Sequence, residues 1–324
     1  MKTQEKARRH AEKSGFGKRP ERTVWLASMA LAAAGAAVLP SVAARGNIFV
    51  TNFSGHTIGE YSNSGSVVNA SLVSGLTTPF GLALSGSDLF LANIDHSIGE
   101  YTTSGTTVNS SLITGFTEAN DVAVSGSDLF VVDISKGTVG EYTTSGTTLN
   151  ASLISGLSSP ASIAISGSDL YVVNNGSGKV GEYTISGSTV SASNASLITG
   201  LTSAYGIAVM GSDLFVVNQS GNSIGEYTTS GSVVNASLIS GLHTPYELAV
   251  SGSNLFVANF SNNTVGEYTI ASDGTVSASN PSFISSGLDG PVGIAVDVPE
   301  PVSLSLLAIG GVALLLGKRR RRSA

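Results

Sequence analysis

Two acidic residues occupy equivalent places in a repeated sequence pattern and are the side chains best suited to bind a ligand. Asp121 and Glu247 each precede a short apolar run, Val-Ala-Val or Leu-Ala-Val, where the other copies of the pattern carry Gly or Ser. If six copies close into a ring, these two places face each other across its axis. Facing carboxylates suit a hard cation such as Ca²⁺. Four nearby polar residues are further candidate ligands: Glu118, Asn120, Asp133 and Asp95.

A simpler interpretation, which we prefer, treats these residues as solvated loop carboxylates of a very acidic protein. Between residues 46 and 298 there are eighteen Asp or Glu but only two basic residues, Lys136 and Lys179, which gives a net charge of −16. Such a surface repels phosphate backbones, so we expect no binding of nucleic acid.

Other catalytic groups are poorly represented in the sequence. The chain has no cysteine, which excludes disulfides, thiolate metal sites and cysteine nucleophiles. His56, His96 and His243 fall in separate expected loops, so we interpret them as surface residues. The many Ser-Gly pairs are interpreted as turns rather than as a nucleophile elbow.

The elements that must position these residues come from a repeat. Six copies of a pattern such as DLFVVN start 41, 40, 41, 44 and 41 residues apart, at Asn47, Asp88, Asp128, Asp169, Asp213 and Asn254. A period near 40 residues that contains four short strands is typical of a β-propeller blade. In the copy at 206–246 we expect strand a as GIAV, strand b as DLFVVN, strand c as SIGEYT and strand d as VVNASLI.

Short Gly-containing turns between the runs predict antiparallel hairpins. The second run is apolar at consecutive positions, Leu214 to Val217, so both faces of its sheet must be covered. Blades that pack face to face around an axis cover both faces of each sheet. A β-solenoid is the alternative, but its coils need no reversing turn every five or six residues.

The two ends of the repeat array predict how the ring closes. The first copy begins at strand b, near Gly46, and the last ends after strand a, Gly293 to Val296. We therefore predict an all-β, six-bladed propeller over residues 45–298, closed by pairing of the C-terminal strand a with the N-terminal strands b to d. Closure leaves no open edge between the first and last copies.

The patterns P-x-G-I-A-V, L-F-V-A-N and V-G-E-Y resemble NHL and related six-bladed propellers across 46–298. The NHL-like Asp after strand b is Asn in every copy except Asp133. Similarity to gluconolactonase-like propellers implies an alternative function, a metal-dependent hydrolase or lactonase in which inner-ring carboxylates and amides hold the metal. Virginiamycin-lyase-like propellers require a His and Glu constellation that we do not find.

One motif recurs in all six copies and another in the strand d of five copies. The Glu of Gly-Glu-Tyr is expected to be structural and to bond between blades; it is Glu60, Glu100, Glu141, Glu182, Glu226 and Glu267. Asn-x-Ser triplets match a eukaryotic glycosylation acceptor, but in a bacterial chain we expect them only to mark strand d. They begin at Asn69, Asn109, Asn150, Asn194 and Asn235.

The N-terminal segment has the features of a secretory signal peptide. Eight basic residues within the first 24 precede an uncharged, Ala-rich run, Trp25 to Leu39, and small residues follow at 41–43. We predict a signal peptide over 1–44; a retained membrane anchor is the alternative.

The C-terminal segment predicts sorting to the cell surface. Pro299, Glu300 and Pro301 precede an apolar run, 302–317, and then a basic cluster that would hold its end in the cytoplasm. The cluster is Lys318, Arg319, Arg320, Arg321 and Arg322. This order resembles the PEP-CTERM sorting signal over 299–324, which implies an exosortase-like protease as partner and removal of the tail; a permanent anchor is the alternative.

We therefore expect an exported bacterial surface or extracellular-matrix protein, anchored in the inner membrane until processed. Its propeller would bind exopolysaccharide or surface proteins through the face formed by the variable b–c and d–a loops, since variation among uniform copies marks where specificity resides. Cofactors are expected to be none, or Ca²⁺ in the alternative.

Overall fold

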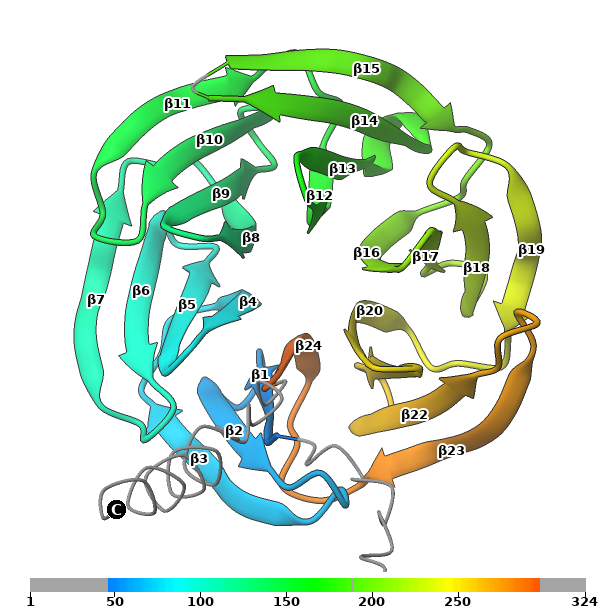
Figure 1. Cartoon of the computed structure of the whole chain (residues 1–324). Coiled ribbons are helices and arrows are strands. Elements are labelled where there is room, and N and C mark those ends of the chain that lie inside the picture. The colour runs from blue at the N-terminus through cyan, green and yellow to red at the C-terminus, as the bar shows by residue number, and fades with distance from the viewer. Residues whose placement is uncertain (1–45, 188, 298–324) are drawn as a thin grey trace, which may run out of the picture. The chain divides into compact units, whose positions relative to one another are not determined.

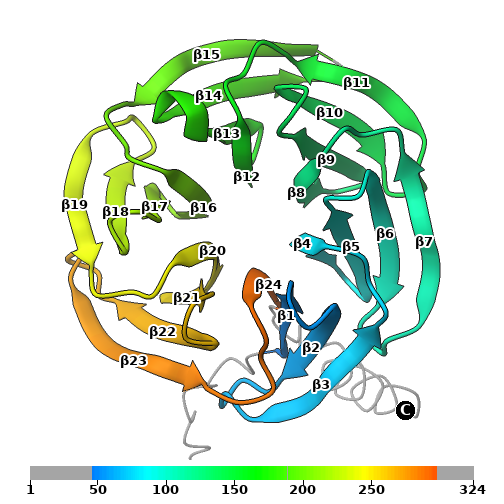
Figure 2. The ribbon, with the colours of Figure 1, turned by 180° about the vertical axis from the view of Figure 1, so that it is seen from behind.

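The alternating hairpins of the repeat form six separate four-stranded sheets. The structure, a computed structural model, describes residues 46–187 and 189–297 of the 324-residue chain. In these residues the sheets are antiparallel and stand in a ring, with inner strands around the axis and outer strands at the circumference (Figures 1 and 2). The predicted six-bladed β-propeller is confirmed, and a linear β-solenoid is excluded.

In each blade the four strands follow the order a, b, c, d from the axis of the ring to its circumference. Blade 1 comprises β24 (Pro291–Val296), β1 (Ile48–Asn52), β2 (Thr57–Tyr61) and β3 (Val67–Ser74). Blade 2 comprises β4 (Pro79–Ser85), β5 (Asp88–Asn93), β6 (Ser97–Thr102) and β7 (Thr107–Thr114). Blade 3 comprises β8 (Ala119–Ser125), β9 (Asp128–Asp133), β10 (Thr138–Thr143) and β11 (Thr148–Ile154).

The other three blades repeat this order. Blade 4 comprises β12 (Pro160–Ser166), β13 (Asp169–Asn174), β14 (Lys179–Ser186) and β15 (Thr189–Ile198), with a short 3₁₀ helix, η1 (Asn175–Ser177). Blade 5 comprises β16 (Ala204–Met210), β17 (Asp213–Asn218), β18 (Ser223–Thr228) and β19 (Val233–Ile239). Blade 6 comprises β20 (Pro245–Ser251), β21 (Asn254–Asn259), β22 (Thr264–Ile270) and β23 (Val276–Ile284).

The continuous apolar run of each strand b fills both of its faces. In β17, Leu214 and Val216 pack in the core between blades 4 and 5. Phe215 and Val217 alternate with them and pack in the core between blades 5 and 6. Because successive side chains of a strand point to opposite faces, a strand between two neighbours needs apolar residues at every position.

The Gly-Glu-Tyr motif is explained by packing within one blade. A Cβ atom on Gly59 would lie 2.7 Å from the hydroxyl of Tyr61, so glycine leaves room for the tyrosine ring. Glu60 accepts a hydrogen bond from Asn47 Nδ2 at 2.6 Å, and that donor belongs to the same blade. The glutamate is thus structural, as predicted, but this hydrogen bond lies within a blade and not between blades.

Blade 1 closes the ring with strands from both ends of the propeller. β24 pairs antiparallel with β1, and Val296 lies opposite Ile48. Thr51 Oγ1 accepts a hydrogen bond from the Gly293 amide at 2.7 Å and donates one to the Phe80 carbonyl at 2.6 Å. One buried hydroxyl therefore joins β24 and β1 of blade 1 to β4 of blade 2, and the predicted closure is confirmed.

Several predictions concern segments outside the described residues. The signal peptide at 1–44, the Pro299–Pro301 motif, the apolar segment at 302–317 and the basic cluster after it all fall there. Within 46–187 and 189–297 no helix is long and apolar enough to cross a membrane.

Candidate functional site: a buried carboxyl pair in the central channel

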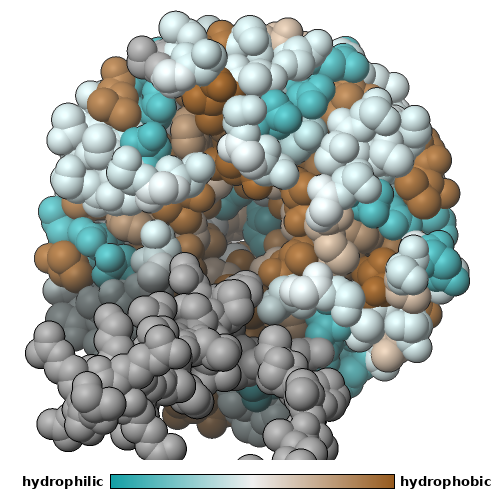
Figure 3. Space-filling view, in the orientation of Figure 1, coloured by the Kyte–Doolittle hydropathy of each residue, from teal (hydrophilic) through white to brown (hydrophobic). Residues whose placement is uncertain are grey.

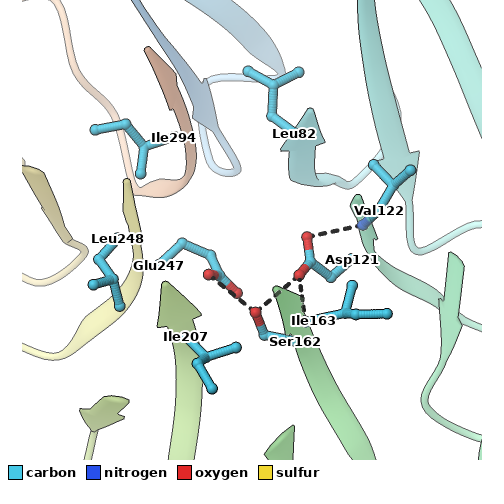
Figure 4. Close-up of a pocket in the computed structure, with 9 residues that line it drawn as sticks. All are labelled: Leu82, Asp121, Val122, Ser162, Ile163, Ile207, Glu247, Leu248 and Ile294. Carbon is cyan, nitrogen blue, oxygen red and sulfur yellow. Dashed lines mark hydrogen bonds between the residues drawn. The ribbon is translucent and has the colours of Figure 1, made fainter. Parts of the chain in front are cut away.

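The six inner strands place equivalent residues in layers around the axis. Their third residues form a small and polar layer, consisting of Gly81, Asp121, Ser162, Gly206, Glu247 and Gly293. Their fourth residues form an aliphatic layer, consisting of Leu82, Val122, Ile163, Ile207, Leu248 and Ile294. The polar residues Asp121, Ser162 and Glu247 and all six aliphatic residues line one cavity of about 80 Å³ (Figure 4).

A β-bulge aims the acidic residues into this cavity. The register between strands a and b shifts between Ala119 and Asp121 in β8 and between Pro245 and Leu248 in β20. An extra residue at such a point bends the strand and re-aims its side chain. Asp121 and Glu247 consequently point towards each other from opposite sides of the ring, as predicted (Figure 4).

Glycine in the preceding blade makes room for each carboxyl group. A Cβ atom on Gly81 would lie 2.4 Å from Asp121 Oδ1, and one on Gly206 would lie 2.8 Å from Glu247 Oε2. The two carboxyl groups therefore lie over the backbone of the neighbouring inner strand. They are almost completely buried, each residue being 6% exposed, so the preferred interpretation as solvated loop carboxylates is wrong for these two.

Asp121 is held by three hydrogen-bond donors. Its Oδ1 accepts from the Val122 amide at 2.8 Å. Its Oδ2 accepts from Ser162 Oγ at 2.8 Å and from the Ile163 amide at 3.0 Å. Donors on both oxygens favour the charged form of a carboxyl group, so they oppose the effect of burial.

Glu247 has fewer partners. Its Oε2 lies 3.3 Å from Ser162 Oγ, while its Oε1 is buried and has no hydrogen-bond partner among the described residues. A hydroxyl group has one proton and can donate to only one of the two carboxyl groups. Since Asp121 is the closer acceptor, Glu247 must carry a proton and donate it to Ser162 Oγ if all three groups are to be paired.

Burial agrees with this assignment of the proton. Desolvation raises the pKa of Asp121 to about 6, against the opposing hydrogen bonds from Ile163, Ser162 and Val122. Desolvation raises the pKa of Glu247 well above its ordinary value, and the nearby charge of Asp121 raises it further, against weaker opposing effects of Ser162 and the Leu248 backbone. Two carboxyl groups in one buried cavity share a proton because they cannot both ionise without a large cost.

An aromatic cluster closes the channel beside the polar layer. It consists of second residues of three inner strands: Phe80 of β4, Tyr205 of β16 and Tyr246 of β20. The ring centroids lie 5.9 Å apart for Phe80 and Tyr205, 5.6 Å for Phe80 and Tyr246, and 4.9 Å for Tyr205 and Tyr246. Blades 2 and 5 stand opposite each other, so contact between their rings spans the whole channel.

The other end of the channel is lined by hydrophobic residues. On the face shown in Figure 3 the centre of the ring is hollowed, and hydrophobic residues surround the hollow. The six aliphatic residues that line the cavity are all buried. A cavity of about 80 Å³ is well below the roughly 300–1,000 Å³ of pockets that bind small molecules, so a polar molecule the size of a sugar does not fit it.

The donor set fits a resident cation poorly. Ca²⁺ takes about six to eight oxygen ligands. The cavity offers Asp121, Ser162 and Glu247, and both oxygens of Asp121 already accept protons from the protein. Among the described residues no group of three or more His, Cys, Asp or Glu is arranged to hold a metal ion.

The other predicted ligands lie away from the carboxyl pair. Asp133 accepts hydrogen bonds from the amides of Thr117, Glu118 and Lys136, and its Oδ2 lies 3.4 Å from Lys136 Nζ, so it orders its own loops. The Glu118 carboxylate accepts a hydrogen bond from Ser135 Oγ. Neither Glu118 nor Asp133 lines the cavity.

Asn120 and Asp95, which were also predicted as ligands, do not line the cavity of the carboxyl pair. Asn120 donates to the Ala161 carbonyl at 2.5 Å and lies 3.4 Å from the hydroxyl of Tyr205, which places it beside the aromatic cluster. Asp95 lines a separate, larger cavity of about 240 Å³. The three histidines are exposed, as predicted.

Sequence reasoning missed Ser162 and the aromatic cluster as parts of this site. The serine was visible as the third member of the series that contains Asp121 and Glu247. The pattern that points to the cluster is an aromatic residue in three of the six copies, directly before that series. What no local pattern reveals is that side chains from opposite blades touch.

Solved structures share this fold. The chain matches one in a nidogen/laminin complex with 15% identity and a TM-score of 0.64, over 77% of this chain and 97% of that one. It matches a gluconolactonase from Xanthomonas campestris with 15% identity and a TM-score of 0.56, over 66% and 79%. It matches virginiamycin B lyase from Staphylococcus aureus with 20% identity and a TM-score of 0.54, over 77% and 84%.

Likeness at these identities concerns the fold alone. No protein-family model matches the chain, and no curated protein matches it in sequence. The neighbours include enzymes and a complex of binding proteins, which illustrates that one fold serves unrelated functions.

Proposed function

We propose that the chain is an exported bacterial surface or extracellular-matrix protein whose propeller binds a partner and does not catalyse a reaction. The observation that carries this proposal is the narrow channel. Where Asp121 and Glu247 meet, aromatic rings from opposite blades close one side and the cavity is too small for a sugar-sized substrate. The carboxyl pair then links β8, β12 and β20 through Ser162 and has no catalytic part.

Exopolysaccharide is the partner that the loop face fits best. A cavity of about 240 Å³ lies between the d–a loop that follows β3 and the b–c loop and outer strand of blade 2. Amide, carboxylate and hydroxyl groups line it, which are the groups that bind sugar hydroxyls. Its polar lining includes Asn93, Asp95, Ser97, Ser110 and Ser111.

The charge of Asp95 distinguishes this blade from the others. The equivalent residue is serine in four blades, at Ser54, Ser135, Ser220 and Ser261. Replacing Asp95 with serine therefore restores a residue that the repeat already accepts. The change is expected to alter ligand contacts without altering the fold.

Co-sedimentation of the secreted protein with its host's own polysaccharide tests the proposal. We expect Asp95→Ser to weaken binding about tenfold, because a lost hydrogen bond to a charged group costs roughly 1.5 kcal/mol or more. Asp273→Ser removes a similar charge from an exposed c–d turn at the opposite end of the strands and should leave binding unchanged.

The opposite result would support the hydrolase. Turnover of lactones by the wild-type protein, lost in both Asp121→Asn and Glu247→Gln, would show that substrate reaches the channel. A rise in melting temperature with Ca²⁺ that the same two variants abolish would add a metal to that conclusion. Either outcome would refute a purely binding role.

A further inference from the structure

Five Asn-x-Ser triplets lie on the outermost strands of five blades, and their asparagines have no part in the function proposed above. Their asparagines are exposed, and so are the serines two residues further along. Figures 1 and 2 show these strands, β3, β7, β11, β15 and β19, at the circumference of the ring. The asparagines are Asn69, Asn109, Asn150, Asn194 and Asn235.

All five asparagines adopt the same local hydrogen-bonded geometry. In each triplet the amide of the serine donates to the asparagine Oδ1 at 3.1 Å. Within 46–187 and 189–297 the Nδ2 atoms of these asparagines make no hydrogen bond. Each side chain therefore has its oxygen bound to the backbone and its nitrogen left for another partner, and the donor on the oxygen polarises the amide group.

The triplets also interrupt the regular pairing of the outer strands. In blade 1, Asn69 lies opposite Glu60, but Val73 lies opposite Ile58, so the outer strand has two extra residues in this interval. The same shift follows the asparagine in the other four blades. A bulged, exposed strand at the edge of a sheet gives an enzyme access that a paired strand does not.

These outer strands are edges that need protection. Each pairs with strand c on one side only. In four of the five, the residue before the asparagine is an exposed Val or Leu: Val68, Val108, Leu149 and Val234, each 49% to 54% exposed. An exposed edge with apolar side chains is a template for pairing with another chain.

The outer strand of the sixth blade, β23, has a proline in place of an intact Asn-x-Ser triplet. Asn280 of β23 lies opposite Glu267, as its counterparts do, but Pro281 follows it and breaks the Asn-x-Ser pattern. Proline has no amide proton to give to a neighbouring strand and is a common residue on protected edges. Each of the six outer strands thus carries either an intact triplet or a proline.

We propose that these five asparagines are sites of N-linked glycosylation, and that the sugars shield the outer edges of the blades. The donor would be a sugar activated as a nucleotide or polyprenyl diphosphate. Nδ2 attacks the anomeric carbon, the carbon–oxygen bond to phosphate breaks, and the diphosphate leaves with its electron pair. The proton from Nδ2 passes to a base of the transferase. Of the five triplets, only that of Asn109 contributes residues to the polysaccharide cavity, through Ser110 and Ser111.

Peptide mass spectrometry of the full chain purified from its native host tests the proposal. We expect peptides that contain each of the five asparagines to carry the mass of one or more sugar residues on the asparagine. The peptide with Asn280 should have its unmodified mass. A variant lacking residues 2–44 separates the two donors: sugar retained on it indicates a nucleotide-linked donor, and sugar lost indicates a lipid-linked donor on the far side of the membrane.

Three substitutions separate modification from mere exposure. Ser111→Ala keeps Asn109 and the backbone amide that bonds to it, yet should abolish sugar at Asn109 alone; Ser111→Thr should restore it. Pro281→Ala should create a sixth modified site at Asn280. Unmodified masses at all five asparagines, sugars found only on Ser or Thr, or sugar that persists on Asn109 in Ser111→Ala would each overturn the proposal.

Discussion

At the scale of single residues, Ser162 determines how two buried carboxyl groups coexist. Its hydroxyl lies between Asp121 and Glu247 and can donate to only one of them. Asp121 has two backbone amides as further donors, whereas Glu247 Oε1 has no hydrogen-bond partner in the described part of the chain. The negative charge therefore belongs on Asp121 and the shared proton on Glu247.

The raised pKa values of this pair predict a dependence of stability on pH. A carboxyl group whose pKa is raised in the folded protein retains a proton that the unfolded chain has already lost, so the free energy of unfolding falls as pH rises. For Asp121 the loss begins near its ordinary pKa of 3.8 and continues to about 6; Glu247 extends it to higher pH. Denaturant unfolding at pH 4 and pH 8 should show greater stability at pH 4.

Neutralising Glu247 should remove much of this loss. Glu247→Gln keeps a donor for Ser162 Oγ, the side-chain amide nitrogen, and cannot ionise, so we expect roughly 1–3 kcal/mol more stability than wild type at pH 8. At pH 4, where both versions are neutral at this position, the difference should nearly vanish.

Asp121→Asn is the contrasting variant: its amide would face a backbone amide of Val122 or Ile163, so it should destabilise by about 1–3 kcal/mol. Equal unfolding curves for Glu247→Gln and wild type at pH 8 would contradict the assignment of the proton.

At the scale of the strand, differences between copies show which variants the fold tolerates. In blades 1 and 6, an asparagine directly before or at the start of strand b donates to the Glu of strand c, at 2.6 Å for Asn47 and 2.9 Å for Asn254. In blades 3 and 5 the same place holds Asp128 and Asp213. There burial, and then the facing aspartate, raise the pKa of Glu141 and of Glu226.

Converting such an aspartate to asparagine should stabilise its blade. Glu141 is buried, and its Oε2 lacks a hydrogen-bond partner among the described residues. Asp128→Asn would replace a repulsion with a donor, and we expect a gain of about 0.5–1.5 kcal/mol in the free energy of unfolding at pH 7. Asp88→Asn makes the same change beside the half-buried Glu100 and should have a smaller effect. A lower melting temperature for Asp128→Asn would show that the residue has another role.

At the scale of the whole molecule, stability depends on joining strands that are far apart in the sequence. Thr51 and Gly293 are 242 residues apart and share a buried hydrogen bond, and Thr51 also donates to blade 2. A ring closed in this way has no exposed edge between its first and last copies. The closing blade is consequently where the loss of one hydroxyl group affects the whole ring.

Thr51→Val tests this closure. Valine keeps the shape of the side chain but leaves the Gly293 amide and the Phe80 carbonyl without their partner, which should cost about 2–4 kcal/mol. Thr51→Ser keeps the hydroxyl and loses only a methyl group, at about 1 kcal/mol. Equal destabilisation by the two variants, measured by denaturant unfolding, would mean that packing rather than hydrogen bonding closes the ring.

The sorting prediction also belongs to the whole molecule. We expect the full-length protein to reach the cell surface through a membrane-bound intermediate that its C-terminal segment holds. A version that ends after Val298 should leave the cell without that intermediate, because it lacks the apolar run and its basic cluster. Fractionation with an antibody to the propeller measures this, and recovery of both versions from the same fractions would argue against the sorting role.

The number of blades, the order of their strands and the way the ring closes could all be predicted from the amino-acid sequence. These follow from local patterns: a 41-residue period, turns after each short run, and an array that begins at strand b and ends at strand a. The sequence also showed that Asp121 and Glu247 are equivalent members of facing blades. Regular repeats allow this because each copy adopts the same local structure and packs on its neighbour in the same way.

The environment of those two residues became apparent only in the folded ring. Ser162 meets Glu247 across 85 positions of sequence, and the rings of Phe80 and Tyr205 meet from opposite blades. These contacts exist only once the ring has closed. They bury two acidic residues that the sequence suggested were exposed loop groups, and the buried pair shares a proton. Charge and protonation depend on burial and on the nearest donors, and both are properties of the folded ring rather than of any one copy.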